Sequence, residues 1–248
     1  MFYNIIKLLI FAAMNIELLD IRAGRRAIFP VLIKGDGYNI LVDASYPGTL
    51  HRIEKAIMQR GVSMEELTHV VVTHHDFDHI GSLAALKRKY PHVQVVASEQ
   101  EAPYIAGKKK SLRLRQAEDL FHSLPEEERP QALRFQHLLE SVETVEVDRK
   151  VKNGDLIAQG VVVVETPGHT PGHISLYMPD NKALVAGDAL VLRNERLEIA
   201  NPEYTLDMSA ALNSIKLISS LNLNTILCYH GGAYTGDCAE ALQYILGI

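Results

Sequence analysis

The sequence predicts an α/β fold in which two β-sheets pack together with helices on the outside. Two observations favour this fold. Short apolar strands alternate with amphipathic helices in both halves of the chain, and a charged helical segment at 99–142 separates the halves. Each sheet must bury a face against another layer, so two such successions are best satisfied by two packed sheets. With 248 residues, 47% of them hydrophobic, one domain with a sizeable core is expected over 14–248.

Elements of the first half are predicted from apolar runs and turn residues. Strands are expected at 16–21, 27–33, 38–42, 70–72 and 93–97. Gly35, Asp36 and Gly37 supply a hairpin turn between the second and third strands. Helices are expected over 47–60 and 82–90. The apolar face of the first helix is predicted to comprise Leu50, Ile53, Ile57 and Met58.

The second half repeats this alternation after the charged helical segment. Strands are expected at 161–165, 174–177, 183–186 and 225–229, and helices at about 209–220 and 238–246. The sequence shows no internal repeat and no low-complexity linker.

Composition excludes several classes of function. The formal net charge of −5 gives no global basic field, so no nucleic-acid partner is expected. Cys228 and Cys238 are the only cysteines, too few for a disulfide framework, which fits free thiols in a reducing cytoplasm. A homodimer stays open.

The N-terminal residues 1–13 are apolar and interrupted by Lys7. They are too short to span a bilayer, which takes about 20 apolar residues, so no stable membrane association is expected. They also lack the order of a signal peptide, which has its basic residues before the apolar run. We interpret them as an extension preceding a natural start at Met14, with secretion as the alternative to a cytoplasmic location.

The strongest chemical signal follows the apolar run at 70–72. Three histidines and two aspartates lie within six residues: His74, His75, Asp76, Asp78 and His79. Neutral imidazole and carboxylate are the usual protein ligands of zinc and related divalent ions. A strand that ends in such a cluster therefore predicts a metal site at the edge of a sheet.

This segment resembles the His-x-His-x-Asp-His motif of the metallo-β-lactamase superfamily. Three further segments, at 166–173, 186–189 and 229–232, resemble the family's later motifs and come in the same order. The resemblance covers roughly residues 15–248. It implies a four-layered αβ/βα sandwich, with two mixed sheets face to face and helices outside.

The resemblance also implies a binuclear metal centre, with zinc as the expected ion. His74, Asp76 and His169 would bind the first ion, and Asp78, His79 and His230 the second. Asp188 would bridge the two ions.

Asp76 departs from the pattern, because the family usually has histidine there. Its carboxylate would ligate the first ion, or that site would be weakened or would recruit His75. Counting charges, two divalent ions, three aspartates and a bridging hydroxide make a formally neutral site. That count predicts a weaker Lewis acid than a site with histidine at 76, and oxygen ligation would admit manganese or iron.

Several residues beside the motifs have supporting roles or ordinary structural explanations. Asp43 ends a strand and would orient a metal-binding histidine, or it is an ordinary turn residue. His173 and His75 are interpreted as structural residues near the site. Gly168 and Gly172 would allow tight turns in the loop that carries His169.

The implied reaction is hydrolysis by a metal-bridging hydroxide that attacks an electrophilic centre. Asp78 would pass a proton to the leaving group, and Asp188 would hold the bridged pair together. Small esters, lactones and thioesters are the expected substrates. Alternatives are a phosphodiesterase and an iron-containing redox or oxygenase enzyme of the same fold.

Branches of the family differ in features that this chain can be compared with. Lactonases that act on acyl-homoserine lactones usually have tyrosine where this chain has Val191, and glyoxalase-II-like thioesterases carry a further helical region after the last motif. The segment 99–142 would cap the site. Its cations would then attract an anionic substrate, or they form an ordinary solvated face: Lys108, Lys109, Lys110, Arg113 and Arg115.

Overall fold

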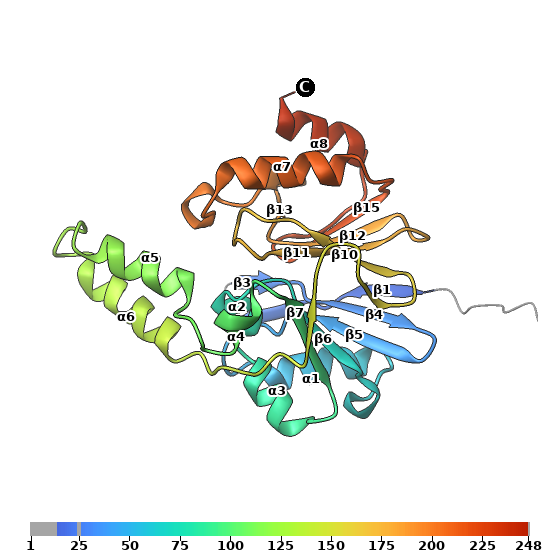
Figure 1. Ribbon diagram of the computed structural model, residues 1–248, viewed down its shortest axis with the longest axis horizontal. Helices are drawn as coiled ribbons and strands as arrows, with labels where there is room; N and C mark the ends of the chain where they lie inside the picture. Colours follow the sequence, from blue (N-terminus) through green and yellow to red (C-terminus); the bar gives the residue numbers. More distant parts are fainter. Residues whose placement is uncertain (1–13, 24–25, 248) are drawn as a thin grey trace, which may run out of the picture.

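The computed structural model describes residues 14–23 and 26–247, so the predicted extension at 1–13 lies outside the described residues. Two six-stranded sheets lie face to face, and helices cover the outer side of each (Figure 1). The predicted four-layered αβ/βα sandwich is therefore confirmed. Among the described residues, no helix has the length and apolar character needed to cross a membrane.

The first sheet comes from the first half of the chain, with strand order β1-β4-β5-β6-β7-β8. Its strands are β1 (Asn15–Leu18), β4 (Val31–Gly35), β5 (Tyr38–Val42), β6 (His69–Val72), β7 (Gln94–Ser98) and β8 (Arg149–Val151). The strands from β5 to β8 run parallel. Helices α1 (Leu50–Gln59) and α3 (Leu83–Lys89) cover its outer face (Figure 1).

The second sheet comes from the second half, with strand order β16-β15-β12-β11-β10-β9. Its strands are β9 (Leu156–Ala158), β10 (Val161–Glu165), β11 (Ile174–Met178), β12 (Ala183–Gly187), β15 (Thr225–Cys228) and β16 (Gly232–Tyr234). Helices α7 (Met208–Ser219) and α8 (Cys238–Leu246) lie on its outer face (Figure 1). Cys228 and Cys238 are buried on this side as free thiols.

The main core lies between the two sheets and follows the alternation of side chains along each strand. In β6, Val71 packs between the sheets, whereas Val70 and Val72 belong to the cluster beneath α1 and α3. Both faces of these central strands are thus buried, which explains why their sequences are continuous apolar runs. The polar residues that follow these strands therefore lie in loops at the edge of the sheet, outside its buried faces.

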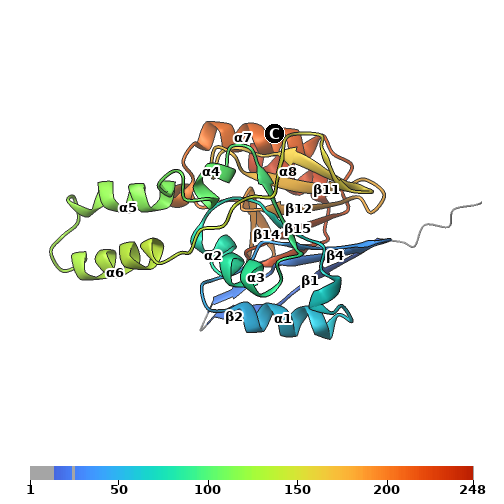
Figure 2. The ribbon, with the colours of Figure 1, turned by 60° about the horizontal axis from the view of Figure 1, so that its bottom comes forward.

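The segment 99–142 forms helices, as predicted. It contains α4 (Ala102–Ile105), α5 (Leu112–Phe121) and α6 (Arg129–Glu140). Helices α5 and α6 pair as a hairpin that projects from one side of the sandwich (Figure 1), and Figure 2 shows the same projection after rotation. We call these two helices and their connecting turn the helical hairpin.

Some predicted elements were wrong in detail. The expected strand 16–21 is interrupted after β1, and its last residue begins the separate strand β2 (Ile21–Ala23). The expected strand 27–33 is likewise interrupted, so that β3 (Arg26–Ile28) and β4 are separate strands. Pro30 has no N–H to donate, and β4 begins only after it. Met58 is 58% exposed rather than buried. The buried face of α1 is formed by Ile53 and Ile57, and Met58 lies outside it.

Candidate metal centre

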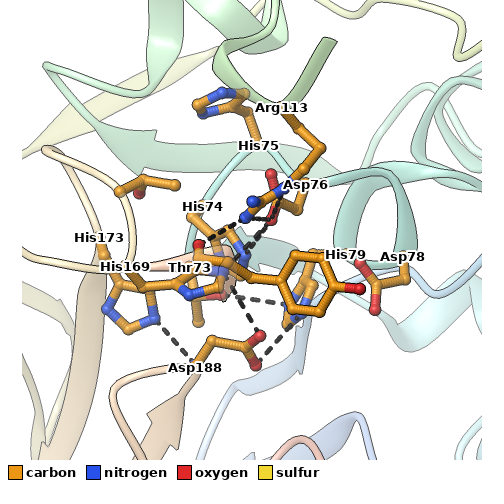
Figure 3. A network of polar contacts seen from close by, with 12 residues as sticks. Thr73, His74, His75, Asp76, Asp78, His79, Arg113, His169, His173 and Asp188 are labelled. Carbon is orange, nitrogen blue, oxygen red and sulfur yellow. Dashed lines mark hydrogen bonds and ion pairs between the residues drawn. The ribbon is translucent and has the colours of Figure 1, made fainter. Parts of the chain in front are cut away.

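The predicted site residues come from loops that follow strands of both sheets. His74 and the short helix α2 (Phe77–Ile80) follow β6, and Asp188 follows β12. His169 lies between β10 and β11, and His230 follows β15. These loops bring the predicted ligands together, and Figure 3 shows His74, Asp76, His79, His169 and Asp188 gathered around one point.

Six of the seven predicted ligands form two groups of three. One group is His74, His169 and Asp188, and the other is Asp78, His79 and His230, with ligand atoms within 4.8 Å of one another in each. Asp188 connects the groups. Its Oδ1 lies 3.4 Å from His79 Nε2, while its Oδ2 lies 3.6 Å from His169 Nε2 and 3.5 Å from His230 Nε2.

These separations fit metal ligands better than hydrogen bonds. Two atoms bound to one tetrahedral zinc at about 2.0–2.1 Å lie roughly 3.3 Å apart, whereas hydrogen-bonded N and O atoms lie about 2.7–3.2 Å apart. Several buried polar atoms also have no hydrogen-bond partner among the described residues: His74 Nε2, Asp76 Oδ1, His79 Nε2, His169 Nδ1 and Asp188 Oδ1. Buried polar atoms are rarely left unpaired, so this cluster has the donor set and the unmet bonding capacity for divalent cations.

Asp43 holds His79 in a fixed orientation. Its Oδ2 accepts a hydrogen bond from His79 Nδ1 at 2.8 Å and another from the Thr73 hydroxyl at 2.8 Å, and its Oδ1 accepts from the Thr73 N–H. Asp43 has φ of 66°, a conformation that few non-glycine residues adopt. With Nδ1–H committed to Asp43, Nε2 is the ring nitrogen of His79 that faces the site and would bind an ion after losing its proton. The geometry therefore favours the orienting role over an ordinary turn.

Asp76 lies beside the first group but is held by a residue that the motif does not contain. Its Oδ2 is 3.2 Å from His169 Nε2 and 3.7 Å from His74 Nε2. The same oxygen accepts hydrogen bonds from Arg113 Nη2 at 2.7 Å and Nε at 3.2 Å. Arg113 belongs to α5 and is buried, so this cation of the helical hairpin is not part of a solvated face.

Arg113 changes the formal charge of the site. Burial raises the pKa of Asp76, but the nearby imidazoles of His169 and His74 and the Arg113 charge outweigh burial and hold the pKa well below its usual range. Asp76 is therefore ionised, and Arg113 compensates its charge. The pair has the same net charge as one neutral histidine, so the weaker Lewis acid expected from Asp76 alone no longer follows.

The remaining carboxylates give the site a negative potential. Burial lowers the pKa of His79, but Asp188 and Asp43 outweigh it and raise the pKa well above its ordinary value. Burial likewise opposes the charge on His230, yet Asp188 and Asp78 raise its pKa to about 10. Burial raises the pKa of Asp188, whereas the His230 and His79 charges hold it well below its usual range. In the metal-free protein, His79 and His230 therefore hold protons at a place whose negative charge would also favour a metal cation.

Sequence reasoning missed Glu101, which connects the two histidine loops. Its side chain is fully buried. One oxygen accepts hydrogen bonds from the His75 N–H and from His75 Nδ1, and the other accepts from the Thr170 hydroxyl at 2.7 Å and the Gly172 N–H at 3.0 Å. Because Nε2 of His75 also accepts from the Leu112 N–H, His75 anchors α5 and faces away from the metal ligands.

His173 has the predicted structural role. Its Nε2 accepts a hydrogen bond from the Asp188 N–H at 2.9 Å, and its Nδ1 contacts the Thr166 hydroxyl at 2.8 Å. Gly187 allows this approach, because it has φ of 54° and a Cβ there would lie 2.7 Å from His173 Nε2. Gly168 allows a similar approach to the backbone of Ala211, where a Cβ would lie at 2.4 Å. Both contacts place the loops that carry Asp188 and His169.

Comparison with known protein families gives one match over most of the chain. A sequence profile described as the metallo-beta-lactamase superfamily matches residues 23–230.

Curated relatives include proteins with and without a stated activity. The uncharacterized protein YobT of Bacillus subtilis (strain 168) is 32% identical over 170 residues, which cover 67% of this chain and 65% of YobT. The probable metallo-hydrolase YflN of the same strain is 29% identical over 215 residues, covering 79% of this chain and 76% of YflN. A hydroxyacylglutathione hydrolase of Rhizobium meliloti is 26% identical over 170 residues, covering 64% of this chain and only 50% of that enzyme.

Solved structures share the fold. A metallo-beta-lactamase family protein from Thermus thermophilus superposes with a TM-score of 0.73 at 21% identity, covering 94% of this chain and 78% of that one. An archaeal metallo-beta-lactamase superfamily protein from Sulfolobus tokodaii gives a TM-score of 0.67 at 16% identity, covering 95% of this chain and 86% of that one.

Proposed function

The chain belongs to the metallo-β-lactamase superfamily, and from that premise we propose that it hydrolyses a small ester, lactone or thioester with two divalent metal ions. Zinc is the ion we propose, because imidazole and carboxylate ligands in groups of three suit it. The names of its relatives support a hydrolase, since they include a probable metallo-hydrolase and hydroxyacylglutathione hydrolases.

One observation carries this proposal. Two groups of three ligating side chains share the carboxylate of Asp188, and buried nitrogen and oxygen atoms in them have no hydrogen-bond partner among the described residues. In this arrangement His74 and His169 would bind one ion and Asp78, His79 and His230 the other, with Asp188 between them. When bound, such ions would lower the pKa of a water molecule and polarise the oxygen of a substrate carbonyl.

The side chains around the ligands would keep this arrangement rigid. Asp43 fixes the ring of His79, and Arg113 fixes the carboxylate of Asp76. The oxygen of Asp76 that faces His169 and His74 is Oδ2, the one that Arg113 holds, so Asp76 would act on the first ion from beside Arg113.

Asp78 is suited to move a proton. Its carboxylate lies 3.4 Å from His230 Nε2 and lines the cavity above the site, where a leaving group would depart. A carboxylate in that place can accept a proton from water and return it to the leaving oxygen or sulfur.

The substrate class is tested with a panel of hydrolysable compounds. The protein is stripped of metal with a chelator, reloaded with zinc, manganese or iron(II), and assayed with p-nitrophenyl acetate, γ-butyrolactone, an acetyl thioester and bis(p-nitrophenyl) phosphate. We expect metal-dependent turnover of at least one carboxylic ester, lactone or thioester, at rates at least tenfold above the phosphodiester. Turnover of the phosphodiester alone, or oxygen consumption by the iron form without hydrolysis, would contradict the proposal.

A further inference from the structure

The metal centre opens into a cavity that the helical hairpin closes on one side. The cavity has a volume of about 1070 Å³. Its floor is formed by candidate ligands that include Asp78, His169, Asp188 and His230, and its walls by residues from the hairpin and from the loops of the sandwich. A substrate positioned for reaction at the floor would therefore extend along these walls.

The hairpin contributes an apolar stripe along α6, bordered by the polar side chains of Glu128 and Gln131. Ala132, Phe135 and Leu138 of α6 recur every three residues, so they share one face of the helix, and all three line the cavity. The ring of Phe135 also meets the edge of Phe77, with ring centroids 5.7 Å apart, and Phe77 lies between Asp76 and Asp78 in the metal-binding segment. Leu138 is 39% exposed, so apolar surface remains available at the wall.

The loops of the sandwich add further apolar surface to the cavity. Val191 and Leu192 line it and are partly exposed, next to the polar lining residues Arg193 and Asn201.

The cations in and near this cavity do not make it an anion site. Among the lining residues that the structure describes, the arginines are Arg113, which is paired with Asp76, and Arg193, which lies 3.6 Å from Glu198. Lys108 and Lys110 are paired with Glu146 and Glu118, and neither lines the cavity. Nothing in these walls therefore matches the paired cations that recognise a phosphate or a carboxylate.

We propose that the substrate carries an uncharged apolar chain that lies in this cavity against α6 while its reacting carbonyl lies at the metal centre. This inference rests on the proposed ester, lactone or thioester hydrolysis, and it narrows the substrate to those esters, lactones or thioesters that carry an apolar acyl or alkyl chain. Ligand sites of comparable size, about 300–1,000 Å³, are usually apolar with a few polar groups that fix orientation.

The first test varies chain length in two series. Acyl length is varied from acetyl to octanoyl in p-nitrophenyl esters, and alcohol length from ethyl to octyl in acetate esters. Burial of one methylene corresponds to about a fourfold gain in binding, so we expect kcat/KM to rise roughly two- to fourfold per methylene in one series. The series that responds identifies which side of the carbonyl occupies the cavity, and a flat response in both would overturn the inference.

The second test fills the cavity. The Ala132→Phe variant places a ring in the wall of α6 and should lower the kcat/KM ratio of the longest to the shortest substrate, octyl to ethyl or octanoyl to acetyl, at least tenfold. Leu133→Phe is the matched control, because Leu133 neighbours Ala132 on α6, is 41% exposed and does not line the cavity. The control should keep the wild-type ratio. Equal ratios for the two variants would contradict the inference.

Binding of octanamide separates this inference from the proposed reaction. Octanamide is uncharged and resists hydrolysis, so calorimetry reports the cavity without turnover. Binding that weakens at least tenfold in Ala132→Phe but not in Leu133→Phe supports the apolar site even if no ester is hydrolysed. Ester hydrolysis without octanamide binding would leave the proposed function intact and overturn the inference. Sedimentation velocity is measured on the same variants. If Ala132→Phe changes the sedimentation coefficient but not octanamide binding, the cavity-facing side of α6 contacts a second copy of the chain, and the inference is overturned.

Discussion

Arg113 donates two hydrogen bonds to one oxygen of Asp76, from Nη2 at 2.7 Å and Nε at 3.2 Å, and both side chains are buried. Nη2 of Arg113 also donates to the Tyr204 carbonyl, and Nη1 donates to Gln116, so the guanidinium is held from several sides. This ion pair joins the helical hairpin to the metal-binding segment. It also places a compensated carboxylate where the family usually has a neutral imidazole.

Replacement of Arg113 should strengthen metal binding while it weakens the metal-free fold. In Arg113→Met the Asp76 carboxylate loses its buried partner, which costs about 3 kcal/mol of unfolding free energy without metal. The freed negative charge should raise zinc affinity roughly tenfold or more, because a nearby cation no longer repels the ion. Urea unfolding of the metal-free protein and zinc competition with a fluorescent chelator measure the two effects.

A double variant tests whether Asp76 and Arg113 act as a unit. Asp76→His should lower zinc affinity while Arg113 stays unpaired, and Asp76→His with Arg113→Met should restore it. Arg115→Met is the matched control, since Arg115 lies two residues further along α5 and is exposed. Additive effects of the two substitutions would show that the residues are not coupled.

Glu101 is expected to stabilise the site from a distance. Glu101→Gln keeps the size of the side chain but removes the charge that accepts hydrogen bonds from His75, Thr170 and Gly172. The unfolding free energy should fall by about 2–4 kcal/mol, because buried donors lose a charged acceptor. Glu99→Gln, at an exposed position two residues earlier, should change stability by less than about 0.5 kcal/mol. Equal stability of the two variants in urea unfolding would contradict this role.

Asp43 should control the second group of ligands through the ring of His79. In Asp43→Asn an amide N–H₂ can face Nδ1 of His79, which favours the tautomer with a proton on Nε2, the atom directed at the site. Zinc affinity should fall about 10- to 100-fold, as when other orienting partners of ligand histidines are removed. Asp36→Asn in the exposed hairpin turn is the control. Chelator competition measures both variants, and an unchanged affinity in Asp43→Asn would exclude the orienting role.

Metal binding should release protons. The pKa of His79 is raised well above its ordinary value and that of His230 to about 10, so both imidazoles are protonated at neutral pH in the metal-free protein. A metal binds neutral imidazole, so it must displace these protons, and its affinity should rise as pH increases from about 6.5 toward 9. Calorimetry in buffers of different ionisation enthalpy counts the protons. Zinc affinity that is independent of pH, after correction for the buffer and chelator, would contradict these pKa directions.

The sequence predicted the layers and most of the strand ends, because apolar runs bounded by turn residues are local signals. It also predicted the loops that carry His74, His169, Asp188 and His230, which lie together at one edge of the sandwich as the motifs imply. The short strands β13 (Leu190–Arg193) and β14 (Arg196–Ile199) were missed. Four residues give too little periodicity to recognise.

The supporting residues of the site could not be predicted in the same way. Arg113 lies in a run of cations where sequence alone does not distinguish a buried guanidinium from solvated ones. Glu101 follows β7 without any motif, and its role depends on two loops that meet it only after folding. Asp43 was the exception, because a carboxylate at the end of a strand beside a metal-binding segment is itself a signal.

The most direct test of the binuclear centre is the number of metal ions bound per chain. Purified protein is dialysed against a small excess of zinc, washed, and measured by mass spectrometry of the metal together with protein concentration. The geometry predicts two ions per chain for the wild type, about one for His230→Ala, and fewer than one for Asp188→Ala because both groups share that carboxylate. Wild-type protein that retains one zinc ion per chain, or none, after this treatment would contradict the account.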